Sequence, residues 1–99
     1  MILTITMVVL PSGSTYPAVE VASGIFLTHP NLSVETLLRP YEKAVIDALQ
    51  KETTQLDVIS AADSGVQFML PLGENWKAPL SVHSGKEGQV IALLHYGPA

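Results

Sequence analysis

The sequence predicts a single α+β domain, residues 1–99, with one amphipathic helix packed on one face of a mixed, mostly antiparallel sheet. Three observations support this class. The chain has 99 residues, which is the size of one domain. One long stretch has the apolar period of a helix, and the rest alternates or forms short apolar runs between turn residues. The expected order is β-β-α-β-β-β, counted without the short stretch 80–84.

The first two strands are expected before residue 30. Residues 2–10 alternate, and because both faces carry apolar side chains we expect a strand covered on both sides. Pro11-Ser-Gly-Ser14 is a turn cluster. A second strand is expected over 18–28, with Ser23-Gly24 as an internal bulge or bend.

Residues 33–52 carry the helical pattern. At 100° per residue one stripe of this segment is apolar, and it contains Val34, Leu37, Leu38, Tyr41, Val45, Ala48 and Leu49. Pro40 leaves two starts open. If Ser33 is the N-cap, Pro40 lies inside the helix and removes a hydrogen bond. If Thr36 is the N-cap, Pro40 falls at the end of the first turn.

Short strands are expected after the helix. Residues 56–61 and 66–70 are interpreted as a hairpin around Asp63-Ser-Gly65, and residues 73–79 as a loop. Residues 80–84 form a further short strand, which Gly85-Lys-Glu-Gly88 turns into the final apolar run over 89–96.

The first and last strands are the most nearly apolar on both faces, so both are expected at the centre of the sheet, side by side. This arrangement is β-grasp-like, and its order resembles that of the ubiquitin-like proteins. Modifiers and carriers of that family end in a flexible Gly-Gly. Here the tail is Gly97-Pro98-Ala99, which disfavours a carrier or modifier role.

Composition indicates contact with other proteins. Only 14% of the residues are charged while 47% are hydrophobic, so we expect apolar surface on the isolated chain. The net charge is −4, and the basic residues are scattered, which argues against nucleic-acid binding. No signal peptide or membrane helix is expected. We therefore expect a small acidic protein of the cytoplasm.

Catalytic, cofactor-binding and metal-binding residues are not expected. Cysteine is absent, and no G-x-S-x-G motif or P-loop occurs. His83 and Ser84 are adjacent, so in a strand they point to opposite faces. His29, His83 and His95 have none of the usual ligand spacings. The chain is therefore expected not to be an enzyme.

The candidate partner-binding residues form two groups. Trp76 and Tyr16 are loop aromatics, which are common interface anchors, although a lone tryptophan also folds over the edge of a core. The second group shares the sheet face away from the helix and contains Ile2, Thr4, Val8, Leu10, Ile91, Leu93 and His95.

The chain is predicted to be a small protein-binding module that acts as an inhibitor or adaptor of a larger protein target. Many compact phage- or plasmid-borne proteins act in this way. The alternative is a structural subunit that self-assembles into a homo-oligomer through the same apolar face.

Overall fold

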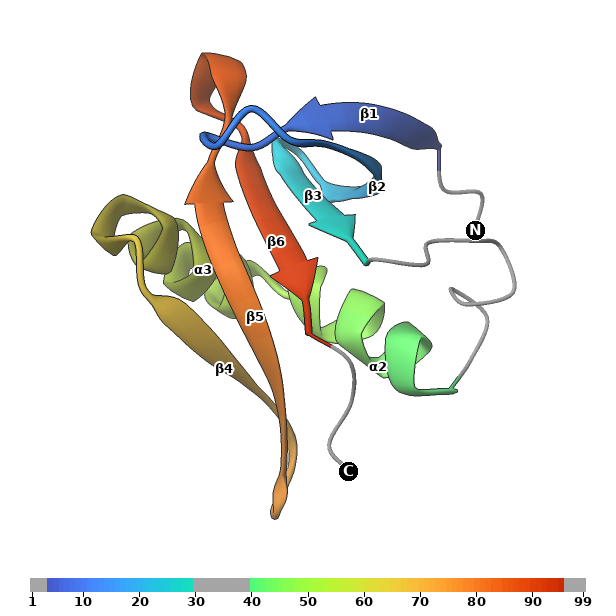
Figure 1. The fold of residues 1–99 in the computed structure, drawn as a ribbon. Helices are drawn as coiled ribbons and strands as arrows, with labels where there is room; N and C mark the ends of the chain where they lie inside the picture. The colour runs from blue at the N-terminus through green and yellow to red at the C-terminus, as the bar shows by residue number, and fades with distance from the viewer. Residues whose placement is uncertain (1–3, 30–39, 96–99) are drawn as a thin grey trace.

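The structure, a computed structural model, describes residues 4–29 and 40–95. In this part of the chain a six-stranded mixed sheet carries two helices on one face (Figure 1), which confirms the predicted α+β class. The strand order is β1-β2-β3-β6-β5-β4, and only β3 and β6 are parallel. The strands are β1 (Ile5–Val9), β2 (Thr15–Ala22), β3 (Ile25–Thr28), β4 (Gln67–Gly73), β5 (Trp76–Ser84) and β6 (Val90–Leu94).

The last strand is central, as expected, but the first strand is not its neighbour. Within residues 4–29 and 40–95, β1 is an edge strand that pairs only with β2, and β3 takes the place beside β6. The reason is that residues 18–28 do not form one bulged strand. They contain a turn at Ser23-Gly24, where Gly24 has φ 78, a value that glycine adopts without strain. The chain therefore makes three antiparallel strands before the helices, and the β-grasp-like pairing is wrong.

Two helices, and not one, follow the first three strands. α2 (Pro40–Leu49) lies within the expected helix, while residues 33–39, with both proposed N-caps, lie outside the described residues. α3 (Glu52–Ser64) covers the stretch 56–61 that was expected to be a strand, so the hairpin of 56–61 with 66–70 is also wrong. Val58, Ala61 and Ala62 are its buried residues, at the i, i+3 and i+4 spacing of a helix.

β4 and β5 form a hairpin that was not expected from the sequence. The two strands pair from Gln67 and Ser81 to Gly73 and Trp76, so the expected loop 73–79 is wrong and Trp76 is the first residue of β5. The turn from β5 into β6 is where it was expected and contains the short 3-10 helix η1 (Lys86–Gly88). Across this turn His83 pairs with Ile91.

The core consists of two clusters on opposite faces of the sheet. The larger cluster lies between the sheet and the helices and includes Leu27, Leu49, Val58, Leu80 and Ala92. The smaller one, here called the second cluster, consists of Val8, Leu10, Ala18, Phe26 and Ile91, with Tyr16 packed against it. β1 and β6 are separated by two strands, and Ala18 of β2 and Phe26 of β3 lie between Val8 and Ile91 in this cluster. β1 runs across the direction of β6 in Figure 1, as the twist of a sheet produces.

Three prolines lie within strands, each where a ladder N–H is not required. The hydroxyl of Thr28, the last residue of β3, donates to the Pro17 carbonyl. The backbone N–H of His95, just past the end of β6, donates to the Pro79 carbonyl at 3.1 Å. Both prolines thus sit opposite the end of the neighbouring strand. Pro71 lies on β4, an edge strand, which is where a sheet tolerates proline.

Candidate functional site

The part of the sheet formed by β4, β5 and β6 is covered by helices on one face only. Figure 1 shows α3 behind β5 and α2 beside the end of β6. Alternation along the paired strands assigns ten side chains to the side without helices. Ile91 is buried in the second cluster, and the other nine are at least partly exposed. We call this surface the open face; it consists of Gln67, Met69, Pro71, Lys77, Pro79, Ser81, His83, Leu93 and His95.

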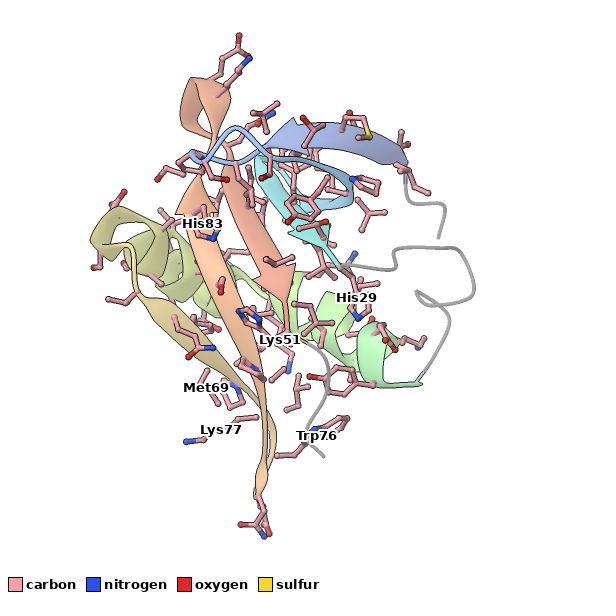
Figure 2. All side chains as sticks on the ribbon, viewed as in Figure 1. His29, Lys51, Met69, Trp76, Lys77 and His83 are labelled. Carbon is pink, nitrogen blue, oxygen red and sulfur yellow. The ribbon has the colours of Figure 1, made fainter. Side chains whose placement is uncertain are left out.

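Apolar and polar side chains are mixed on all three strands of the open face. Met69 is 46% exposed, and it lies opposite Pro79 on the neighbouring strand. Figure 2 shows Met69, Lys77 and His83 along the β4–β5 part of the sheet. A mixture of this kind, on rigid strands, is what a protein partner meets at an interface.

A hydrogen bond between two side chains fixes the middle of the open face. The Ser81 hydroxyl and His95 Nε2 are bonded to each other, and the backbone N–H of His95 also donates to the Pro79 carbonyl. These two bonds hold the imidazole of His95 against β5. Because side chains that are already ordered lose less entropy on binding, a pre-organised imidazole favours recognition.

The open face carries positive or titratable groups and no carboxylate. Its ionisable side chains are Lys77, His83 and His95. The exposed acidic residues of the helices are Asp47, Glu52, Asp57 and Asp63. The described helices and their junction also carry the exposed lysines Lys43 and Lys51, so their exposed carboxylates outnumber their exposed lysines by two, whereas the open face carries one lysine and no carboxylate.

Trp76 is held against the helix layer. Its ring and that of Tyr41 in α2 are 5.3 Å apart between centroids, tilted by 39°, a geometry in which aromatic pairs attract. Burial, and next the neighbouring Glu42 carboxylate, raise the pKa of Tyr41 above its usual value. Trp76 thus closes the tip of the β4–β5 hairpin over α2, which is the second of the two roles that the sequence left open.

The other sequence-predicted residues are divided among three surroundings. Val8 and Ile91 are buried in the second cluster, so the expectation that they contribute to an uncovered face is wrong. Tyr16 is half-buried in β2 and not in a loop, and Thr4 is exposed. Leu93 and His95 lie on the open face, whereas Ile2 lies outside the described residues.

Only residues 76–79 of β5 were expected to lie in a loop, which ended at Pro79; residues 80–84 were expected to form a strand. The signal for the longer strand was nevertheless present, because the apolar Ala78, Leu80 and Val82 recur at every second position, as in a strand with one buried face. Extending the strand to Trp76 would have placed Lys77, Pro79, Ser81 and His83 on one surface.

Potential metal ligands are dispersed in the part of the chain that the structure describes. No group of three His, Asp or Glu residues there could hold a metal ion. His83 and Ser84 pair with Ile91 and Val90 respectively, so they lie on opposite faces of β5. Neither described helix is long and apolar enough to cross a membrane.

Fold and site together define a small α+β protein with one open sheet face. Comparisons with protein-family models, with curated proteins and with solved structures find no match to the chain.

Proposed function

We propose that this chain is a non-enzymatic protein-binding module and that the open face is its contact surface. The observation that supports the proposal is the composition of this face, where the exposed apolar Met69 lies among Lys77, His83 and His95 with no carboxylate. An inhibitor or adaptor of a larger protein would use such a face as a rigid platform.

The charge of the face indicates the chemistry of its partner. An acidic protein surface with apolar patches would pair its carboxylates with Lys77 and the imidazoles, and would cover Met69 and Leu93. A second protein with a basic surface would instead meet the acidic side chains of α2 and α3. We therefore assign the partner to the acidic class.

The test compares two lysines that differ in location and share the same chemistry. Lys77 lies on the open face, and Lys51 lies at the junction of α2 and α3; both side chains are exposed. The purified chain would be immobilised and exposed to an extract of its source cells, and the retained proteins identified by mass spectrometry. Lys77→Glu and Lys51→Glu change the net charge equally, so Lys51→Glu is the matched control.

The proposal predicts that at least one acidic protein is retained by the wild type and by Lys51→Glu. Its affinity for Lys77→Glu should be at least about tenfold lower, which corresponds to one interfacial charge pair replaced by repulsion. Equal retention by the two variants, or no specific retention by the wild type, would contradict the open face as the contact surface.

Self-assembly is the second candidate function. The observation that favours it lies at the other end of the sheet, where the edge strand β1 contains no charged residue and no proline.

A further inference from the structure

The outer edge of β1 has none of the features that normally prevent strand addition. Edge strands are usually protected by charged side chains, proline or a bulge. β1 has the sequence ITMVV and pairs with β2 in unbroken register. Moreover, the first charged side chain of the whole sequence is Glu20. The residues of β1 themselves therefore present no side-chain charge to an approaching strand.

The position of Pro17 shows which backbone groups of β1 point outwards. Pro17 lies opposite Met7 and has no N–H, so this pair does not exchange hydrogen bonds. Because bonded and non-bonded pairs alternate in an antiparallel ladder, Thr6 and Val8 bond to β2. The N–H and C=O groups of Ile5, Met7 and Val9 then face away from the sheet.

The opposite edge of the sheet follows the same geometry but is blocked. Pro79 lies opposite Met69, so by the same alternation the outward groups of β4 belong to Gln67, Met69 and Pro71. Pro71 has no N–H to offer, and a register shift follows it between Pro71 and Gly73. An added strand would therefore find one donor missing and the backbone bent.

We propose that β1 pairs with β1 of a second copy, antiparallel, about a two-fold axis that passes beside Met7. Met7 is the central residue of the strand, and its backbone groups point outwards. A two-fold axis there places Met7 opposite Met7 and Ile5 opposite Val9 of the other copy. All three outward residues then exchange hydrogen bonds with outward residues, so the edge is complementary to itself, as a two-fold interface requires.

The side chains of the outward residues support the same arrangement. Met7 is 59% exposed and Ile5 is 46% exposed, because these side chains lie on the helix side of the sheet at the end the helices do not reach. In the dimer the two Met7 side chains lie opposite each other and Ile5 packs on Val9, which are favourable apolar cross-strand pairs. The continuous sheet would contain twelve strands, twice the six of one copy.

The interface is small, so the dimer is expected to be weak. Pairing of one short edge strand buries less than a standard protein interface, which places the dissociation constant at or above about 1 μM. Each copy carries a net charge of −4. Since this repulsion is long-range and the interface itself is uncharged, added salt should strengthen the dimer.

This inference specifies the second candidate function and does not depend on the open face. It is tested by sedimentation equilibrium of the full chain over a concentration series, with two matched variants. Met7→Lys places a charge at the centre of the β1 edge. Met69→Lys makes the same change at an exposed methionine on the β4 edge and the open face. Amide hydrogen exchange of Ile5, Met7 and Val9, followed by NMR at low and high concentration, reports the new hydrogen bonds directly.

We expect the wild type and Met69→Lys to dimerise with similar affinity, and Met7→Lys to dimerise at least about tenfold more weakly. In the wild type, the three outward amides should exchange more slowly at high concentration. A wild type that stays monomeric would overturn the proposal, even if β1 amides gained protection when another protein was added. A dimer that resists Met7→Lys would overturn it equally, because the contact would then lie elsewhere. Loss of dimerisation in Met69→Lys alone would assign self-association to the open face.

Discussion

The two halves of the sheet differ in how far the side chains on the face away from the helices are buried. In the half formed by β1, β2 and β3, Val8, Leu10, Ala18 and Phe26 fill this face in the second cluster, together with Ile91 of β6. In the half formed by β4, β5 and β6, all the other side chains on this face are at least partly exposed, and they are polar and apolar together. Strands with similar alternation thus end in different surroundings.

The two edges of the sheet differ in how well they are protected against strand addition, and here the half with the buried face is the less protected one. The half with the buried face ends in an unprotected, uncharged strand, whereas the half with the open face ends in a strand blocked by Pro71. Each half therefore has one surface suited to contact and one that is protected. We propose a different protein for the open face because of its lysine and its lack of carboxylates, and a second copy for the β1 edge because its outward backbone groups are complementary to themselves.

The largest effects are expected in the cores of the two halves. Leu80→Ala removes a fully buried side chain between β5 and the helices, and should lower the free energy of unfolding by about 2–5 kcal/mol. Val8→Ala removes less volume from the second cluster and should cost about 2 kcal/mol. Urea denaturation measures both.

A loss below about 0.5 kcal/mol for Val8→Ala, the level of an ordinary surface substitution, would show that the second cluster is not closed in solution. The burial of β1 side chains in this cluster would then be wrong, and so would the comparison between the two halves of the sheet. The Met7→Ala variant, at an exposed position of the same strand, is the control for general effects of shortening a side chain in β1.

The sequence was sufficient to predict the class of the fold and the central place of the last strand. Residues 90–94 are almost uniformly apolar, and all but Leu93 are buried, as expected of a strand covered on both faces. The partner of this strand could not be predicted. Both β1 and β3 are apolar, and only the turn at Gly24, which splits one expected strand into two, decides that β3 lies beside β6.

The errors in the second half of the chain have a similar origin. Leu56 and Ile59 suggested a strand at 56–61, but they are the exposed residues of α3, and its buried residues are two small alanines and a valine that give a weak apolar pattern. Pro79 suggested a loop because proline removes a donor. Its missing N–H falls opposite the end of β6, a fact that depends on tertiary pairing. The open face was therefore predictable only in part, through Leu93 and His95.

A smaller effect is expected on the open face. Ser81→Ala removes the hydrogen bond to His95 Nε2 and should lower the free energy of unfolding by about 1 kcal/mol. Ser84→Ala is the control, since Ser84 is an exposed serine of the same strand and should change stability by less than about 0.5 kcal/mol. Urea denaturation of the two variants separates these values. Equal effects would mean that the Ser81–His95 bond does not order the open face.

The smallest effect on stability, and the sharpest test of the two edges, is expected for Pro71→Val. The valine keeps an apolar side chain on β4 and restores an N–H that points out of the sheet, so the free energy of unfolding should change by less than about 1 kcal/mol. Self-association should nevertheless increase, because the outward row of β4 becomes complete. Light scattering over a concentration series measures this self-association. The control is Pro11→Val, since Pro11 is an exposed proline in the turn after β1.

If Pro71→Val associates no more than the wild type, a missing donor does not protect the β4 edge. The presence of all three donors on β1 would then be a weaker reason for strand pairing than its lack of charge.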